Sequence, residues 1–141
     1  MIRLAVVDTN VLVSGVLSRD TISPTAQIHN AMVGGKLRLL LSERLLTEYR
    51  RVLLSPHVAK RHGLTETDVD HLLLDIILNS VMRDPIVEVE PGTEAHGDEH
   101  VVALLKTMPG SVLVTGDRRL ADMVAPWCEV KSPADFAAAL V

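Results

Sequence analysis

Near the start of the chain stands the stretch Leu4-Ala5-Val6-Val7-Asp8-Thr9-Asn10-Val11-Leu12-Val13-Ser14. Four apolar residues in a row, with no polar alternation, are typical of a β-strand that is buried on both faces. The apolar run ends at Asp8, and a helical pattern follows from about Asn10 to Leu17. A buried strand that leads directly into a helix is the opening of an α/β unit, so we expect a parallel sheet.

The same alternation of short apolar runs and helix-period segments continues along the chain. Further strands are predicted over residues 37–41, 86–89, 112–114 and 127–130. Helices are predicted over residues 24–33, 42–54, 65–81, 101–108, 118–124 and 133–140. Ser42 and Ser132 stand at N-cap positions, and Thr65 with Asp68 forms a capping-box pair. The pattern predicts the α/β class, a three-layer α/β/α sandwich around a mostly parallel central sheet.

Length and composition set the outer limits of what this chain can be. Its 141 residues predict one domain, spanning residues 1–141. A hydrophobic content of 48% excludes intrinsic disorder. No apolar run reaches the roughly 18 residues of a membrane span, and the one cysteine, Cys128, fits a reducing cytoplasm. The net charge of -4 and the 2% aromatic content argue against a non-specific nucleic-acid coat and against binding by base stacking.

Four acidic residues occupy positions where α/β proteins place their chemistry. Asp8 and Asp117 follow predicted strands, and the carboxyl ends of parallel strands are where sites form in such sheets. Asp98 opens a predicted helix, and Glu48 lies beside the apolar face of another. Each aspartate could also be an ordinary N-cap, and Glu48 could form a salt bridge with Arg51.

Clustered carboxylates point to a cation, because four of them could not all stay ionised together without one. Oxygen ligands suit Mg²⁺ or Mn²⁺, and such ions activate water against a phosphodiester. Asn10 and Thr115 could orient a carboxylate or a bound water. Positive charge for the phosphate could come from several arginines and lysines, or these could be ordinary solvated charges. The foremost are Arg118, Arg119, Arg50 and Arg51, followed by Lys106, Lys60 and Arg61.

Two histidines flank Asp98, but their spacing suggests a zinc site only weakly. His96 and His100 are four residues apart, but Gly97 interrupts any helix there and no H-E-x-x-H motif is present. We predict that both are surface residues.

Taken in order, the acidic motifs resemble those of PIN-domain ribonucleases. The opening Asp8-Thr9-Asn10-Val11-Leu12-Val13-Ser14 is similar to the first signature of that family. It is followed by Ser42-Glu43-Arg44-Leu45-Leu46-Thr47-Glu48, by Asp98 before a helix, and by Val114-Thr115-Gly116-Asp117. The stretch Lys131-Ser132-Pro133-Ala134-Asp135-Phe136 is similar to the T-P-x-x-F close of a branch of VapC-like toxins.

The resemblance implies a small α/β/α fold and Mg²⁺- or Mn²⁺-dependent cleavage of single-stranded RNA. In its terms Asp8, Glu48, Asp98 and Asp117 match an acidic quartet, and Asn10 and Thr115 match its polar supports. Where this branch usually reads D-P-D-D-N, the chain has Glu94-Ala95-His96-Gly97-Asp98-Glu99-His100. Glu99 therefore replaces the usual Asn and is a possible extra metal ligand.

The resemblance also implies partners. Members of the family often form homodimers and are often inhibited by a cognate antitoxin. Arginines in the tail of the antitoxin would pair with the carboxylates of the site. Two other classes stay open. One is an inactive PIN-like RNA-binding or scaffold protein. The other is a phosphatase that uses an aspartate at a strand end, although such an enzyme requires a second Asp at the position of Asn10.

Overall fold

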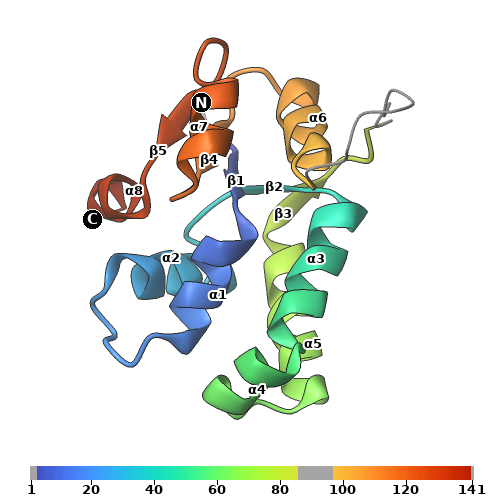
Figure 1. Ribbon diagram of the computed structural model, residues 1–141, viewed down its shortest axis with the longest axis vertical. Coiled ribbons are helices and arrows are strands. Elements are labelled where there is room, and N and C mark those ends of the chain that lie inside the picture. Colours follow the sequence, from blue (N-terminus) through green and yellow to red (C-terminus); the bar gives the residue numbers. More distant parts are fainter. Residues whose placement is uncertain (1–2, 86–96, 141) are drawn as a thin grey trace.

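A computed structural model describes residues 3–85 and 97–140 of the chain. Within them lies a sheet of five parallel strands in the order β3-β2-β1-β4-β5 (Figure 1). The strands are β1 (Ala5–Val7), β2 (Leu39–Leu41), β3 (Ser80–Met82), β4 (Val112–Val114) and β5 (Glu129–Lys131). The helices are α1 (Thr9–Leu17), α2 (Pro24–Val33), α3 (Glu43–Leu53), α4 (Pro56–His62), α5 (Glu66–Leu78), α6 (Glu99–Thr107), α7 (Arg118–Val124) and α8 (Pro133–Ala139).

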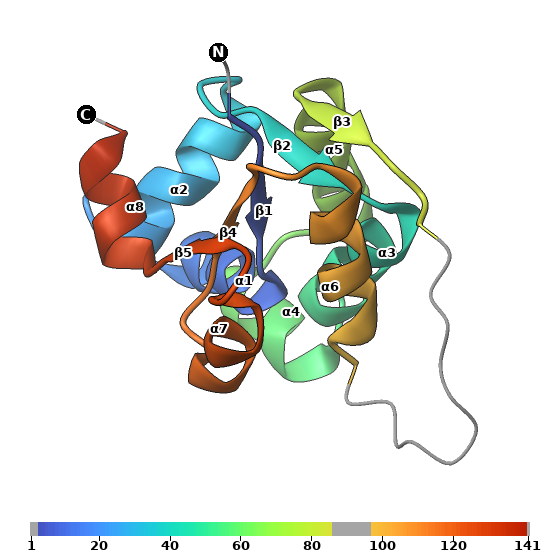
Figure 2. The ribbon, with the colours of Figure 1, turned by 90° about the horizontal axis from the view of Figure 1, so that it is seen from above.

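The predicted fold class is confirmed, because helices cover both sides of the sheet in a three-layer α/β/α sandwich (Figure 2). Every residue of β1, β2 and β4 is buried, as expected for central strands without polar alternation. The sheet is entirely parallel in the described part of the chain. No helix among the described residues is long and apolar enough to cross a membrane.

The strand order places a topological switch point between β1 and β4. The chain leaves β1 toward β2 and β3 on one side, and β4 and β5 lie on the other side. At such a point the two connections diverge and open a crevice at the carboxyl ends of the strands. The backbone N–H of Asp8 donates to the carbonyl of Val114 at 3.0 Å, which fixes the two strand ends together at that crevice.

Helices α1 and α2 approach each other unusually closely at Gly15. A Cβ atom at this position would lie 2.3 Å from the carbonyl oxygen of Thr25 and 2.7 Å from the Cβ of His29. Only glycine therefore permits this packing, which brings one face of α1 against the start of α2.

Several predicted boundaries are confirmed, and others are wrong. Ser42, Ser132 and the Thr65–Asp68 capping box cap their helices as predicted. The helix predicted over residues 65–81 ends at Leu78, and a strand follows at residues 80–82. The strand predicted over residues 86–89 lies outside the described residues. Helix α4 was not predicted, and β5 begins two residues later than the predicted strand.

Candidate active site at the carboxyl edge of the sheet

Asp8 stands at the end of β1, held by two hydrogen bonds. One carboxylate oxygen accepts the backbone N–H of Thr9 at 2.9 Å, which caps α1, and the other accepts the hydroxyl of Thr115 at 2.7 Å. Burial raises the pKa of Asp8, and the nearby charges of Glu48 and Asp117 raise it further, against the opposing effect of the Thr115 hydroxyl. Asp8 is therefore both an N-cap and part of a group of neighbouring acids.

Asp117 caps α7 and is linked to Asp8 through one side chain. Its carboxylate accepts the backbone N–H groups of Arg119 at 2.9 Å and Leu120 at 3.2 Å. Its own backbone N–H donates to the Thr115 hydroxyl oxygen at 3.0 Å. Because that same hydroxyl donates to Asp8, Thr115 fixes the two strand-end acids relative to each other.

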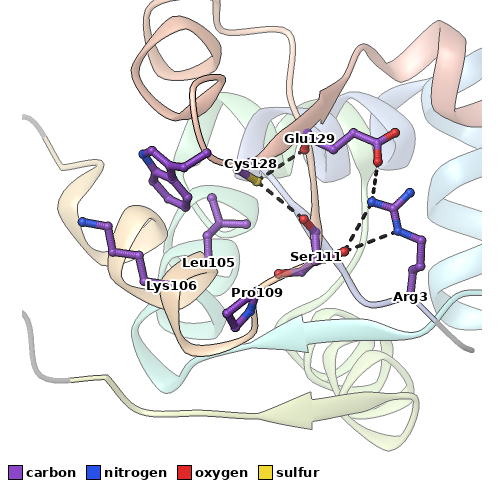
Figure 3. Close-up of a pocket in the computed structure, with 9 residues that line it drawn as sticks. Arg3, Leu105, Lys106, Pro109, Ser111, Cys128 and Glu129 are labelled. Carbon is purple, nitrogen blue, oxygen red and sulfur yellow. Dashed lines mark hydrogen bonds and ion pairs between the residues drawn. The ribbon is translucent and has the colours of Figure 1, made fainter.

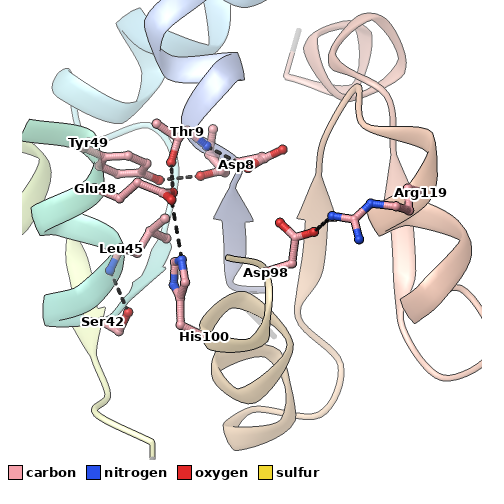
Figure 4. Close-up of polar contacts among 10 residues, drawn as sticks. Asp8, Thr9, Ser42, Leu45, Glu48, Tyr49, Asp98, His100 and Arg119 are labelled. Carbon is pink, nitrogen blue, oxygen red and sulfur yellow. Dashed lines mark hydrogen bonds and ion pairs between the residues drawn. The ribbon is translucent and has the colours of Figure 1, made fainter. Parts of the chain in front are cut away.

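Glu48 reaches the same edge from α3, and a contact made by the next residue helps to position it. The hydroxyl of the next residue, the fully buried Tyr49, donates to the carbonyl of Val7 at the end of β1 (Figure 4). This contact holds α3 beside the strand end. The Glu48 carboxylate then accepts the hydroxyl of Thr9, and its other oxygen lies 3.7 Å from Nε2 of His100. The neighbouring His100 imidazole lowers the pKa of Glu48, with a smaller contribution from Thr9.

The prediction that His100 is a surface residue was wrong. Its side chain is only 4% exposed, and its Nδ1 is buried without a hydrogen-bond partner among the described residues. His100 lies on the buried face of α6 with Val101 and Leu104. Its spacing of four from Leu104 was the available signal, because residues i and i+4 share a helix face. The alternative Glu48–Arg51 salt bridge is also wrong, since His100 occupies the partner position and Arg51 exerts only a weaker, longer-range effect.

Asp98 precedes α6, but its side chain makes no capping hydrogen bond. It accepts instead from the guanidinium of Arg119 on α7 (Figure 4). Burial raises the pKa of Asp98, Arg119 opposes this, and the charges of Asp117, Glu99 and Glu48 add to the rise. The predicted quartet is therefore one electrostatically coupled group, with Arg119 inside it.

The remaining predicted residues lie around this group. Glu99 is half-buried in the first turn of α6, beside Asp98. Arg118 and Arg51 are exposed. Arg50 is directed to α5, where it pairs with Asp70 at 2.8 Å and with Glu66 at 2.6 Å. Asn10 is exposed and lines a hollow along α1 rather than a position between the carboxylates.

A divalent cation fits the donor chemistry of this edge but not the present side-chain positions. Only oxygen ligands meet there besides His100, which suits Mg²⁺ or Mn²⁺. Among the described residues, however, no three acidic, histidine or cysteine side chains form a ready metal-binding group. Arg119 instead contacts Asp98, and Thr9 and His100 contact Glu48.

A separate hollow of about 390 Å³ opens at the opposite edge, where the strands begin (Figure 3). Arg3 precedes β1, Ser111 precedes β4 and Cys128 precedes β5. Lys106 lies over the ring of Trp127, with Nζ 5.4 Å from the ring centroid. This hollow shares no lining residue with the acidic edge.

Comparison of the sequence with known proteins bears on the same region. No curated protein matches the chain. A family model described as PIN domain matches residues 4–119, a range that begins before β1 and includes all four acids and Arg119. The order of acids, the parallel sheet and this match agree, and the chain belongs to the PIN domain family, a superfamily of nucleases.

Proposed function

We propose that this protein is a metal-dependent endoribonuclease that hydrolyses phosphodiester bonds of single-stranded RNA. The observation that carries the proposal is the meeting of Asp8, Glu48, Asp98 and Asp117 at one edge of the sheet, from four different segments of the chain. The four carboxylates are partly buried and repel one another, so a cation bound among them would stabilise the group.

The protein's own side chains position these acids. Thr115 holds Asp8 and the backbone of Asp117, and Thr9 with His100 orients Glu48. These contacts limit the movement of Asp8, Glu48 and the Asp117 backbone at the carboxyl edge of the sheet.

Mg²⁺ or Mn²⁺ would be held by Asp8, Glu48, Asp98 and Asp117, with Glu99 as a possible further ligand. When bound, the ion would neutralise the carboxylates, activate water for attack on phosphorus and stabilise the leaving oxygen. Arg119 occupies Oδ2 of Asp98, so a cation that used this oxygen would have to displace the guanidinium. Arg119, Arg118 and Arg51 would then supply positive charge toward the RNA backbone.

Cleavage of single-stranded RNA with added Mn²⁺ or Mg²⁺ tests the proposal. Asp8→Asn and Asp98→Asn should each abolish cleavage, and chelation should abolish it in the unmodified protein. Asp122→Asn is a matched control, because Asp122 is an exposed acid on α7 outside the group. Equal cleavage by all four proteins would contradict the catalytic assignment.

We further propose that the protein acts in the cytoplasm as a toxin of a toxin–antitoxin pair, as a homodimer inhibited by a cognate antitoxin. The support is the VapC-like character of the acidic motifs and of the segment around Ser132-Pro133. Production in bacterial cells should arrest growth for the unmodified protein and not for Asp8→Asn. A short neighbouring reading frame with an arginine-rich tail should relieve the arrest when it is co-produced.

One observation favours a second candidate function, an RNA-binding PIN domain without activity. Two of the four acids already lie against a basic side chain, Asp98 against Arg119 and Glu48 against His100. Binding of RNA with no cleavage at any Mn²⁺ concentration would support this second function over the first.

A further inference from the structure

A polar hollow of about 450 Å³ lies between α1, the start of α2 and the end of α4. Small hydroxyl side chains, one amide, one arginine and two aliphatic residues line it. The polar residues among them are Asn10, Ser14, Ser18, Ser23, Thr25 and Arg61. Beside the hollow, Gly15 allows α1 and α2 to meet closely, and α4 also packs against α1.

The hollow begins at the acidic edge. Asn10 and Ser14 are spaced four residues apart on α1 and share one face of that helix, and Ser18 follows four residues later as its C-cap. Helical residues at this spacing are about 6 Å apart along the helix axis. Asn10 stands two residues after Asp8, in the first turn of the helix that Asp8 caps. A strand bound with one phosphodiester at the acids can therefore continue along this face.

The charge of the hollow suits a phosphate. Arg61 is exposed, no acidic residue lines the hollow, and within the described part of the chain no carboxylate pairs with Arg61. Arg50 and Arg119, in contrast, are both held by acids. An arginine without a carboxylate partner keeps its fork of N–H donors for a phosphate.

The hydroxyl groups suit a ribose. Ser14 donates to the Thr25 hydroxyl at 3.1 Å, and Ser18 and Ser23 share a hydrogen bond of 2.8 Å. A hydroxyl has one donor and two acceptor positions, so Thr25 can accept from Ser14 and still donate its own proton. The ribose 2′-hydroxyl is both donor and acceptor, and it is the group that distinguishes RNA from DNA.

We propose that this hollow is a ribose-phosphate subsite for the RNA strand beside the cleaved bond. Arg61 holds a backbone phosphate there, and the Ser14–Thr25 pair contacts a 2′-hydroxyl. The proposal rests on the proposed ribonuclease function and adds to it where the neighbouring part of the strand lies.

The phosphate contact is tested by RNA binding in an Asp8→Asn background without divalent ions. The affinity of a short single-stranded oligoribonucleotide is measured over a range of salt concentrations. Arg61→Gln should weaken binding about tenfold, as for a charge-assisted hydrogen bond. It should also make the slope of log affinity against log salt less steep by about 0.7, as for one lost phosphate contact on a single strand.

Lys60→Gln is the matched control, because Lys60 is exposed in the same turn of α4 but does not line the hollow. It should leave the salt slope close to that of the parent. Equal effects of Arg61→Gln and Lys60→Gln would overturn the phosphate assignment. Melting temperatures of both variants show that the fold is retained.

The ribose contact is tested with RNA and DNA oligonucleotides of one sequence. Thr25→Val should weaken RNA binding and leave DNA binding unchanged. Thr67→Val is its control, because Thr67 occupies the corresponding second position of α5 and is exposed. A Thr25→Val protein with an unchanged preference for RNA over DNA would overturn the ribose assignment.

These outcomes are separable from those for the proposed function. If RNA binds through Arg61 but the unmodified protein never cuts it, the proposed nuclease function is contradicted and the proposed subsite stands. If the unmodified protein cuts RNA but Arg61→Gln binds RNA no more weakly than Lys60→Gln, the proposed subsite is contradicted and the proposed nuclease function stands.

Discussion

The hydroxyl of Thr115 carries a measurable share of the stability of this fold. It is buried, donates to the Asp8 carboxylate at 2.7 Å and accepts the backbone N–H of Asp117 at 3.0 Å. Thr115→Val keeps the shape of the side chain and removes both hydrogen bonds. A hydrogen bond to a charged group contributes about 1.5–3 kcal/mol and a neutral one about 1 kcal/mol, so we expect a loss of about 2.5–4 kcal/mol.

Urea unfolding at neutral pH measures this loss, with the midpoint falling and the slope unchanged. Thr115→Ser is the control, because it keeps the hydroxyl and removes a methyl group that contributes about 0.8 kcal/mol. The valine variant should therefore be clearly less stable than the serine variant. If the two variants are equally stable, or if valine matches the unmodified protein, the Thr115 hydroxyl does not hold the two acids as the structure indicates.

Three further changes test other parts of the structure. Gly15→Ala should lower stability by about 1–2 kcal/mol in urea unfolding, because the 2.3 Å approach to the Thr25 carbonyl outweighs the helix preference of alanine; a stabilised variant would show that α1 and α2 separate easily. Arg50 lowers the pKa of Asp70 from its usual 3.8, so the ionised form stabilises the fold above that value and this contribution is lost as pH falls through the lowered pKa. The free energy of unfolding, measured between neutral and acidic pH, should therefore fall less steeply with falling pH in Asp70→Asn than in the unmodified protein. Identical pH profiles of the two proteins would contradict the pairing of Arg50 with Asp70. Arg119→Gln should increase the rise in melting temperature caused by Mn²⁺, because it removes a competitor from the acidic edge, and an unchanged rise would contradict that competition.

The strand-end acids were predictable because their positions depend on local patterns. A buried apolar run followed by Asp8 places that acid at the carboxyl end of a strand, wherever the strand lies in the sheet. The run before Asp117 does the same. In a parallel sheet all such ends meet at one edge, so local patterns alone bring these residues to the same side of the molecule.

The boundaries near β3 and α4 were not predictable in the same way. Val81 continues the helical spacing of the apolar residues before it, although it lies in β3. The helix ends at Leu78, and the side chain of its C-cap residue Asn79 donates to the carbonyl of Met32 on α2, a contact that depends on the packed structure. Pro56 suggested only the end of α3, yet it also occupies the first turn of α4 with Ser55 as N-cap.

The partners of the acids were also beyond the sequence pattern. Thr115 and Asp8 are 107 residues apart, and Thr9 and Glu48 are 39 apart. Such contacts arise only once the sheet and its helices have packed. The spacing along α6 could place His100 on a buried face, but not beside Glu48.

The proposed quartet also changes how the net charge of the chain bears on RNA binding. Of the 18 acidic residues, four form the proposed quartet, and the 14 that remain equal the number of lysines and arginines. The formal charge of -4 therefore equals the charge of the four acids alone, and the other acidic residues of the chain equal its lysines and arginines in number. A divalent ion bound there would remove two of these charges, and a second would remove the rest. An acidic composition thus argues against a non-specific coat but not against an enzyme that binds RNA through metal and arginine. The scarcity of aromatic residues argues against binding by base stacking, so the proposed RNA contacts would be made to the sugar-phosphate backbone.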